Sequence, residues 1–204
     1  MSEISDAGAV RVEYSYFPVG ELWEPGFERH DSGFDLAADD AVLTVPGQIV
    51  VRTRVQDHTA PVVLTLSQRQ VESPGEGWVL VGSVPYRPVY TGRMSAFDTT
   101  NGPAGPSREP VEVFGRLTEP GEPALVLDPS RIYAVQVWAF GREDSRERYE
   151  AAVPDDQGGL ADQYETYVIA FSPSGVQELP RSAQTQDRRG RLAAKYGKPP
   201  LNMR

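Results

Sequence analysis

The chain of 204 residues has no cysteine, only two histidines and no long apolar run. Without cysteine it has no disulfides, thiolate metal sites or thiol nucleophile. A membrane-spanning helix needs about 18 or more apolar residues in succession, and no such run occurs. The acidic, polar start from Met1 to Asp6 lacks the apolar core of a signal peptide. We therefore expect a cytoplasmic protein that does not enter a membrane.

Motifs of common enzyme chemistry are also missing from the sequence. There is no Gly-x-Ser-x-Gly elbow, and the two histidines offer few choices of general base. The pair Gly75 and Gly77 lacks the third glycine and the following helix of a phosphate-binding loop. We predict no catalytic residues, no cofactor and no enzymatic activity.

Charge divides the chain into two unequal parts. Residues 181–204 contain seven cations and one acid, so they carry +6, and the preceding 180 residues carry −15 of the total −9. An acidic body favours basic partners and repels nucleic acid. Nucleic-acid binding is therefore expected only through the tail cations, namely Arg188, Arg189, Arg191 and Lys195.

Short alternating apolar segments separated by proline- and glycine-containing turns predict strands. The longest are 131–141 and 164–171, which we expect to pair in antiparallel fashion at the centre of the fold. Their predicted core residues are Val135, Val137, Tyr167, Ile169 and Phe171. Further strands are predicted at 10–16, 41–45, 49–55, 61–66, 78–84, 111–114 and 124–127, with a type II turn at Pro46-Gly47.

This spacing predicts an all-β fold, an antiparallel β-sandwich of about 8–10 short strands. Residues 1–8 are predicted to be disordered, 9–173 to form the sandwich and 174–204 to form a basic tail. The tail is expected to be helical at 182–196 or disordered, because a helix of this length is marginal on its own. Residues 18–35 are predicted to form a long loop.

Two groups of residues are candidates for binding. His30 and His58, each beside an aspartate (Asp31 and Asp57), offer the ligand types of a metal site, although turn residues of no special role are the favoured interpretation. Aromatic and acidic residues of the 18–35 loop offer a partner-binding surface, unless the aromatics cap an edge of the sandwich. These are Trp23, Phe27, Phe34, Glu24 and Glu28.

Other acidic clusters are better explained without a site. Asp39-Asp40 and Asp155-Asp156 lie in turn-like segments. The charged stretch 142–150 could form i,i+4 pairs as a short helix, and we interpret it as a solvated connector.

Two stretches carry a resemblance to known families. The strand Tyr133-Ala-Val-Gln-Val-Trp-Ala-Phe-Gly-Arg142, a charged connector and Glu165-Thr-Tyr-Val-Ile-Ala-Phe-Ser-Pro173 resemble small, mostly uncharacterised β-sandwich proteins of actinobacteria. The opening Val12-Glu-Tyr-Ser-Tyr-Phe17 is similar to the start of competence protein J, an inhibitor of a competence nuclease. The resemblance implies a sandwich that binds a partner and has no catalytic residues of its own.

The sequence therefore favours a non-enzymatic protein-interaction module, an inhibitor or immunity-type protein for a basic partner such as a nuclease. Two alternatives remain open. One is a β-sandwich that binds a small molecule, carbohydrate or metal, and the other is a phage-type or structural assembly component.

Overall fold

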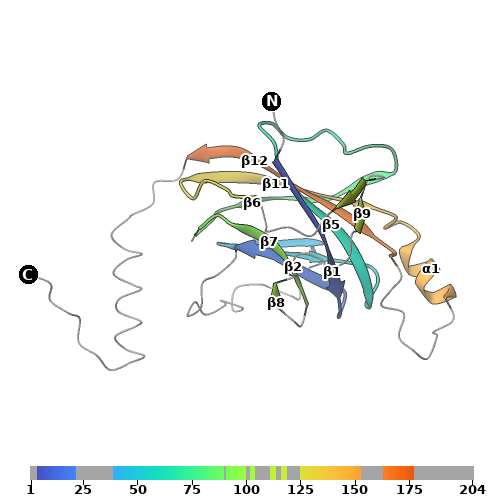
Figure 1. Ribbon diagram of the computed structural model, residues 1–204. Helices are drawn as coiled ribbons and strands as arrows, with labels where there is room; N and C mark the ends of the chain where they lie inside the picture. Colours follow the sequence, from blue (N-terminus) through green and yellow to red (C-terminus); the bar gives the residue numbers. More distant parts are fainter. Residues whose placement is uncertain are drawn as a thin grey trace, which may run out of the picture.

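The structure is a computed structural model that describes residues 4–21, 39–89, 91–99, 102–103, 111–113, 116–118, 125–152 and 163–176. Within these residues the chain forms two five-stranded sheets packed face to face (Figure 1). Among the described residues twelve strands occur, of which three are only two or three residues long. The prediction of an all-β sandwich built mainly from antiparallel pairs is confirmed.

The first sheet contains the predicted central pair. Its strand order is β1 (Ile4–Val12), β5 (His58–Leu66), β12 (Thr166–Val176), β11 (Arg131–Phe140) and β6 (Trp78–Tyr86). β11 pairs with β12 and with β6 in antiparallel fashion, whereas β12 and β5 run parallel. β6 is therefore one edge strand of this sheet and β1 is the other.

The second sheet is built from shorter strands. Its order is β3 (Val42–Val45), β4 (Gln48–Arg52), β2 (Tyr16–Glu21), β7 (Met94–Asp98) and β8 (Gly102–Pro103). A small pair, β9 (Val111–Val113) and β10 (Arg116–Thr118), lies beside β5 of the first sheet (Figure 1). The helix α1 (Ser145–Ala151) connects β11 to β12 beyond the ends of the strands.

The core lies between the sheets and follows the two-residue period of the strands. Tyr133, Val135, Val137 and Ala139 of β11 point inward, and the predicted core residues of both central strands are all fully buried. They face side chains of β2 and β4, and the rings of Phe17 and Tyr167 meet edge to face with centroids 5.1 Å apart.

The outer face of the first sheet is covered as well. Val63, Trp138 and Val168 form a second buried apolar cluster on this face. The amide of Val71 donates a hydrogen bond to Gln136 Oε1 at 2.9 Å, so the connection between β5 and β6 lies across β11. The central strands are therefore buried on both faces, which explains their nearly continuous apolar sequence.

Two predictions near the N-terminus are wrong. β1 begins at Ile4, so residues 4–8 are not disordered; they pair with β5, and Ala7 packs on the outer cluster. The predicted strand 10–16 is interrupted, because Tyr14 and Ser15 have φ values of 64° and 62° and form a tight turn between the sheets. Tyr14 is consequently 65% exposed instead of facing the core.

Elsewhere several strand boundaries differ from the prediction. Residues 16–21 are strand β2, because Phe17 and Val19 fill the core opposite β12, so the predicted loop does not begin at Pro18. Residues 125–127 alternate as predicted but form only an isolated bridge, Arg93 to Val126. β7, β8 and β10 were not among the predicted strands. The turn at Pro46-Gly47 is confirmed, since Gly47 has a φ of 82°.

Candidate functional site

Two buried carboxylates, Glu165 and Glu21, lie at opposite ends of the sandwich. β2 and β4 pair from Tyr16 opposite Arg52 at one end to Gly20 opposite Gln48 at the other. Glu165 lies at the first end and is 1% exposed, and Glu21 lies at the second and is 4% exposed. Buried carboxylates require strong partners, so both are candidates for a functional site.

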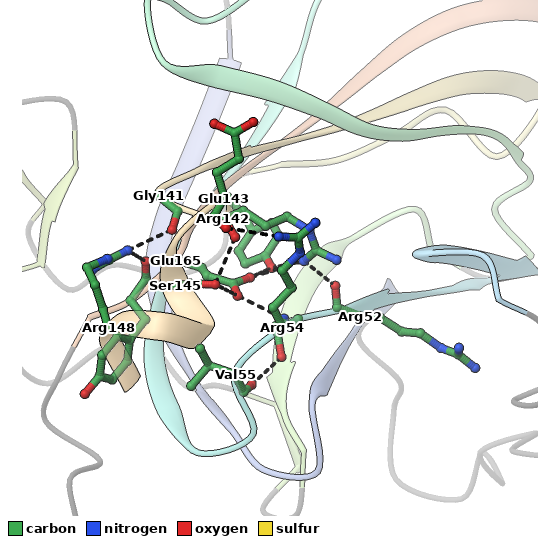
Figure 2. A network of polar contacts seen from close by, with 12 residues as sticks. Arg52, Arg54, Val55, Gly141, Arg142, Glu143, Ser145, Arg148 and Glu165 are labelled. Atoms are coloured by element: carbon green, nitrogen blue, oxygen red, sulfur yellow. Dashed lines mark hydrogen bonds and ion pairs between the residues drawn. The ribbon is translucent and has the colours of Figure 1, made fainter. Parts of the chain in front are cut away.

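Glu165 receives hydrogen bonds from separate segments of the chain (Figure 2). Its Oε1 accepts the Arg54 amide at 2.9 Å and lies 2.7 Å from the Ser145 hydroxyl. Its Oε2 accepts the Tyr167 hydroxyl and pairs with Arg142 Nη1 at 3.2 Å. Both carboxylate oxygens therefore bind donors from the end of β4, from the β11–α1 junction and from β12.

Arg142 connects the two sheets through this carboxylate. Its Nη1 also donates to the carbonyl of Arg52 at 2.8 Å and to the Tyr167 hydroxyl at 2.9 Å. The side chain is only 14% exposed. Arg52 ends a strand of the second sheet and Arg142 follows a strand of the first, so the ion pair joins one end of the sandwich.

The start of α1 is held at the same place. The Ser145 hydroxyl lies 3.0 Å from the carbonyl of Arg142 and 2.7 Å from Glu165 Oε1, so it can donate its proton to either acceptor. On the helix, Arg148 Nη2 donates to the carbonyls of Gly141 at 2.7 Å and Tyr164 at 2.6 Å. These contacts fix the two chain ends that α1 connects. The stretch that we interpreted as a solvated connector thus supplies buried parts of the network.

Burial controls the ionisation of the neighbouring groups. The pKa of Tyr167 is raised well above its ordinary value by burial and, secondly, by the negative charge of Glu165. Burial lowers the pKa of His58 to about 4. The negative charge of Glu165 and a hydrogen bond to the Val55 backbone oppose this shift by smaller amounts. Both ring nitrogens of His58 are buried. His58 is therefore a neutral, buried residue at pH 7.

Glu21 is held by backbone amides. Its Oε1 accepts the Gly92 amide and its Oε2 accepts the Val89 amide, both at 2.6 Å. The connection from β6 to β7 therefore bends around this carboxylate. Beside it, burial and the charge of Glu21 raise the pKa of Tyr86 well above its ordinary value.

Chemically, both sites are suited to holding the fold together. The donors of the Glu165 network already bind acceptors of the protein, and its carboxylate lies below the surface. A general acid or base must instead reach a substrate proton within hydrogen-bonding distance. Each arrangement stabilises a buried carboxylate and holds together the chain segments whose donors bind it.

Most of the sequence-predicted site residues lie outside the described part of the chain. This applies to His30 and Asp31, to the aromatic and acidic candidates Trp23, Phe27, Phe34, Glu24 and Glu28, and to the tail cations. Of the four possible metal ligands, His58 points into the interior from β5 and Asp57 is half-buried. No group of three or more histidine and acidic side chains gathers within the described ranges.

The residues that sequence reasoning missed could have been found from strand periodicity. Glu165 continues the inward series Tyr167, Ile169 and Phe171 by two positions, and Glu21 continues Phe17 and Val19 in the same way. A carboxylate at an inward position requires a partner. Arg142, two residues after the end of the neighbouring strand β11, is the obvious one.

Comparisons with known proteins show a likeness of fold. No protein-family model and no curated protein matches the sequence. The structure is similar to ComJ, inhibitor of the DNA degrading activity of NucA, from Bacillus subtilis, with a TM-score of 0.45 and 15% identity over 85% of this chain and 100% of ComJ. It is also similar to "Crocagin biosynthetic gene J", with a TM-score of 0.39 and 12% identity over 85% of this chain and 99% of that one.

The resemblance of residues 12–17 to competence protein J stands beside a faint structural likeness over 85% of this chain. The resemblance to actinobacterial proteins stays a prediction. In the part of the chain that the structure describes, no helix has the length and apolar character needed to cross a membrane.

Proposed function

We propose that the protein is a non-enzymatic interaction module of the inhibitor type, whose partner is a basic protein such as a nuclease. The observation that carries the proposal is the charge of the body, −15 over residues 1–180. Among the described residues, the exposed acids are Asp39, Asp40, Glu72, Glu76, Asp128, Glu143, Asp144, Glu147 and Glu150, and the exposed cations are Arg11, Arg54, Arg69, Arg87, Arg93, Arg131, Arg146 and Arg148. The net negative charge of the body accelerates encounter with a cationic protein.

The buried polar groups support the non-enzymatic part of the proposal. The Ser145 hydroxyl is directed at Glu165 and the Arg142 carbonyl, which leaves it poorly placed as a nucleophile. His58, with its pKa of about 4, is a weak base and lies in the interior. The most perturbed groups thus serve the fold.

The test is to isolate the partner and to measure how salt changes its association. The full chain is immobilised and incubated at low salt with a lysate of its own host. An unrelated acidic protein of equal pI serves as the control bait. A recovered protein is then purified, and its association rate is measured by stopped flow. We expect a basic protein whose association rate falls by about tenfold or more between low and high salt.

Inhibition is tested on the same pair. If the recovered partner degrades nucleic acid, adding the protein in equimolar amount should suppress the degradation. Recovery of no specific protein, or a partner whose association is independent of salt, would contradict the proposal.

A further inference from the structure

An exposed apolar surface lies where β6 begins and β11 ends. Leu80 is 48% exposed and Phe140 is 47% exposed, and Trp78 lies beside them, half-buried. Phe140 pairs directly with Trp78, and the two ring centroids are 5.7 Å apart. We call Trp78, Leu80 and Phe140 the β6 platform.

The platform is held in place by the backbone beneath it. Gly77 has a φ of 79°, and a Cβ atom at this position would lie 2.8 Å from the Phe140 ring. The glycine therefore lets the aromatic ring lie directly on the turn before β6. Gly75 approaches Trp78 in the same turn, with its Cβ position 3.7 Å from the indole ring.

The platform borders an open strand edge. β6 pairs with β11 on one side, and no described strand pairs with its other side. β3 of the second sheet approaches β6 at Gly82, where a Cβ would lie 2.8 Å from Val42, so the open part is 78–81. Edge strands usually carry charges that prevent pairing with other chains, yet Trp78-Val-Leu-Val81 has none, and Val79 is 39% exposed.

Exposed acidic side chains lie close in sequence to this edge. Glu72 and Glu76 lie in the connection leading to β6, and Glu143 follows Phe140 by three residues; all three are exposed. Figure 2 shows the Glu143 carboxylate directed away from the Glu165 network, while Arg54 Nη1 donates to the Glu143 carbonyl at 3.1 Å. Exposed cations also lie near this surface, because Arg54 binds the Glu143 carbonyl and Arg148 binds the Gly141 carbonyl next to Phe140. The turn and strand from Glu72 to Tyr86, however, contain two acids and no cation.

We propose that the β6 platform and the open edge of 78–81 bind an extended, arginine-containing segment of the basic partner. The segment would add a strand to β6 through main-chain hydrogen bonds. Its guanidinium groups would stack on Trp78 and Phe140 and pair with the surrounding glutamates. This inference rests on the proposed function and adds the binding surface and the chemistry that it recognises.

The test uses a synthetic strand peptide of alternating valine and arginine, titrated into the 15N-labelled full chain. We expect saturable shifts of the amides of 76–82 and 138–141, and none with a peptide of alternating valine and glutamate. Leu80→Lys should weaken binding about tenfold or more. Val126→Lys is the matched control, because Val126 is 52% exposed outside the platform, and it should leave binding unchanged.

Glu76→Lys gives a second variant, placed in an exposed turn where folding is not at risk. Its dispersed amide spectrum should match that of the unaltered chain while binding falls severalfold. The proposal is overturned if the shifts map to another surface, if both peptides bind equally, or if Leu80→Lys and Val126→Lys weaken binding alike. Occupation of 78–81 by a second copy, seen as concentration-dependent sedimentation that Leu80→Lys abolishes, overturns it too.

The two proposals fail in different ways. A recovered basic partner that binds Leu80→Lys and the unaltered chain equally would refute this surface and leave the proposed function standing. Failure to recover any basic partner would refute the proposed function, whatever the peptide does.

Discussion

Glu165 and Glu21 are both buried acids at the ends of one sandwich, yet the protein stabilises them differently. Glu165 pairs with the guanidinium of Arg142 and accepts hydroxyl and amide donors from several segments. Glu21 accepts the amides of Val89 and Gly92 from a single connection. The first arrangement joins two sheets and a helix, and the second determines the path of one loop.

The difference shows which end of the fold depends most on charge. Removing one member of a buried ion pair leaves the other without compensation, whereas a carboxylate held by amides loses hydrogen bonds one at a time. The Glu165 end should therefore respond more strongly to substitution.

The largest effect is expected for Arg142→Met. It leaves Glu165 buried without its cation and should lower the free energy of unfolding by about 3–5 kcal/mol, measured by urea denaturation. The double variant Arg142→Met/Glu165→Gln should recover part of this loss, because no charge then remains buried at this end of the sandwich. A loss below about 1 kcal/mol would mean that water screens the pair.

The pH dependence of His58 comes next. Its pKa of about 4 lies below the unfolded value of 6.5, so the unfolded chain binds the proton first as pH falls. The stability that comes from burying neutral His58 is fully present above pH 6.5. It should be lost as the pH falls from 6.5 to 4, at a cost of up to about 3 kcal/mol in the free energy of unfolding. Denaturation across this range should show a steeper loss for the unaltered chain than for His58→Gln.

His30→Gln serves as the control for this measurement, because it removes the chain's other histidine. His58→Gln should change the pH dependence of stability by the same amount whether or not His30→Gln is also present. Equal slopes for the unaltered chain and His58→Gln would show that His58 does not resist protonation.

At the other end, Glu21→Gln should cost about 2 kcal/mol, because the new amide nitrogen cannot accept a hydrogen bond from a backbone N–H. The loss should be local. Hydrogen exchange should accelerate at Val89 and Gly92 and stay unchanged at Arg54, whose amide binds Glu165. Faster exchange at both ends would contradict the independence of the two sites.

The smallest effect is expected for Arg146→Gln on α1. Arg146 pairs with Glu150 at 2.8 Å, but the side chains are 74% and 62% exposed. Such exposed pairs contribute little to stability because water screens them, so the urea midpoint should barely move. A loss comparable to that of Arg142→Met would overturn the distinction between buried and exposed pairs at this end.

Much of the fold could be predicted from the sequence. The central strands alternate strongly enough that Val135, Val137, Tyr167, Ile169 and Phe171 were placed in the core correctly. Residues 125–127 alternate equally well, but alternation specifies burial and does not specify a pairing partner, so the predicted strand is only a bridge. The site was harder to predict, because two partners of Glu165 are distant in the sequence. Arg142 is 23 residues from Glu165 and Arg54 is 111 residues from it.

The sequence by itself determined the fold class, the central strand pair and the acidic charge, because strand periodicity and composition are local properties of the chain. Tertiary structure decided that Glu165 meets Arg142, that Glu21 organises the connection between β6 and β7, and that Trp78, Leu80 and Phe140 share one exposed face. These depend on strand order and register, which place distant residues side by side. Tyr14 shows the same limit, since only the reversal of the chain between the two sheets turns it outward.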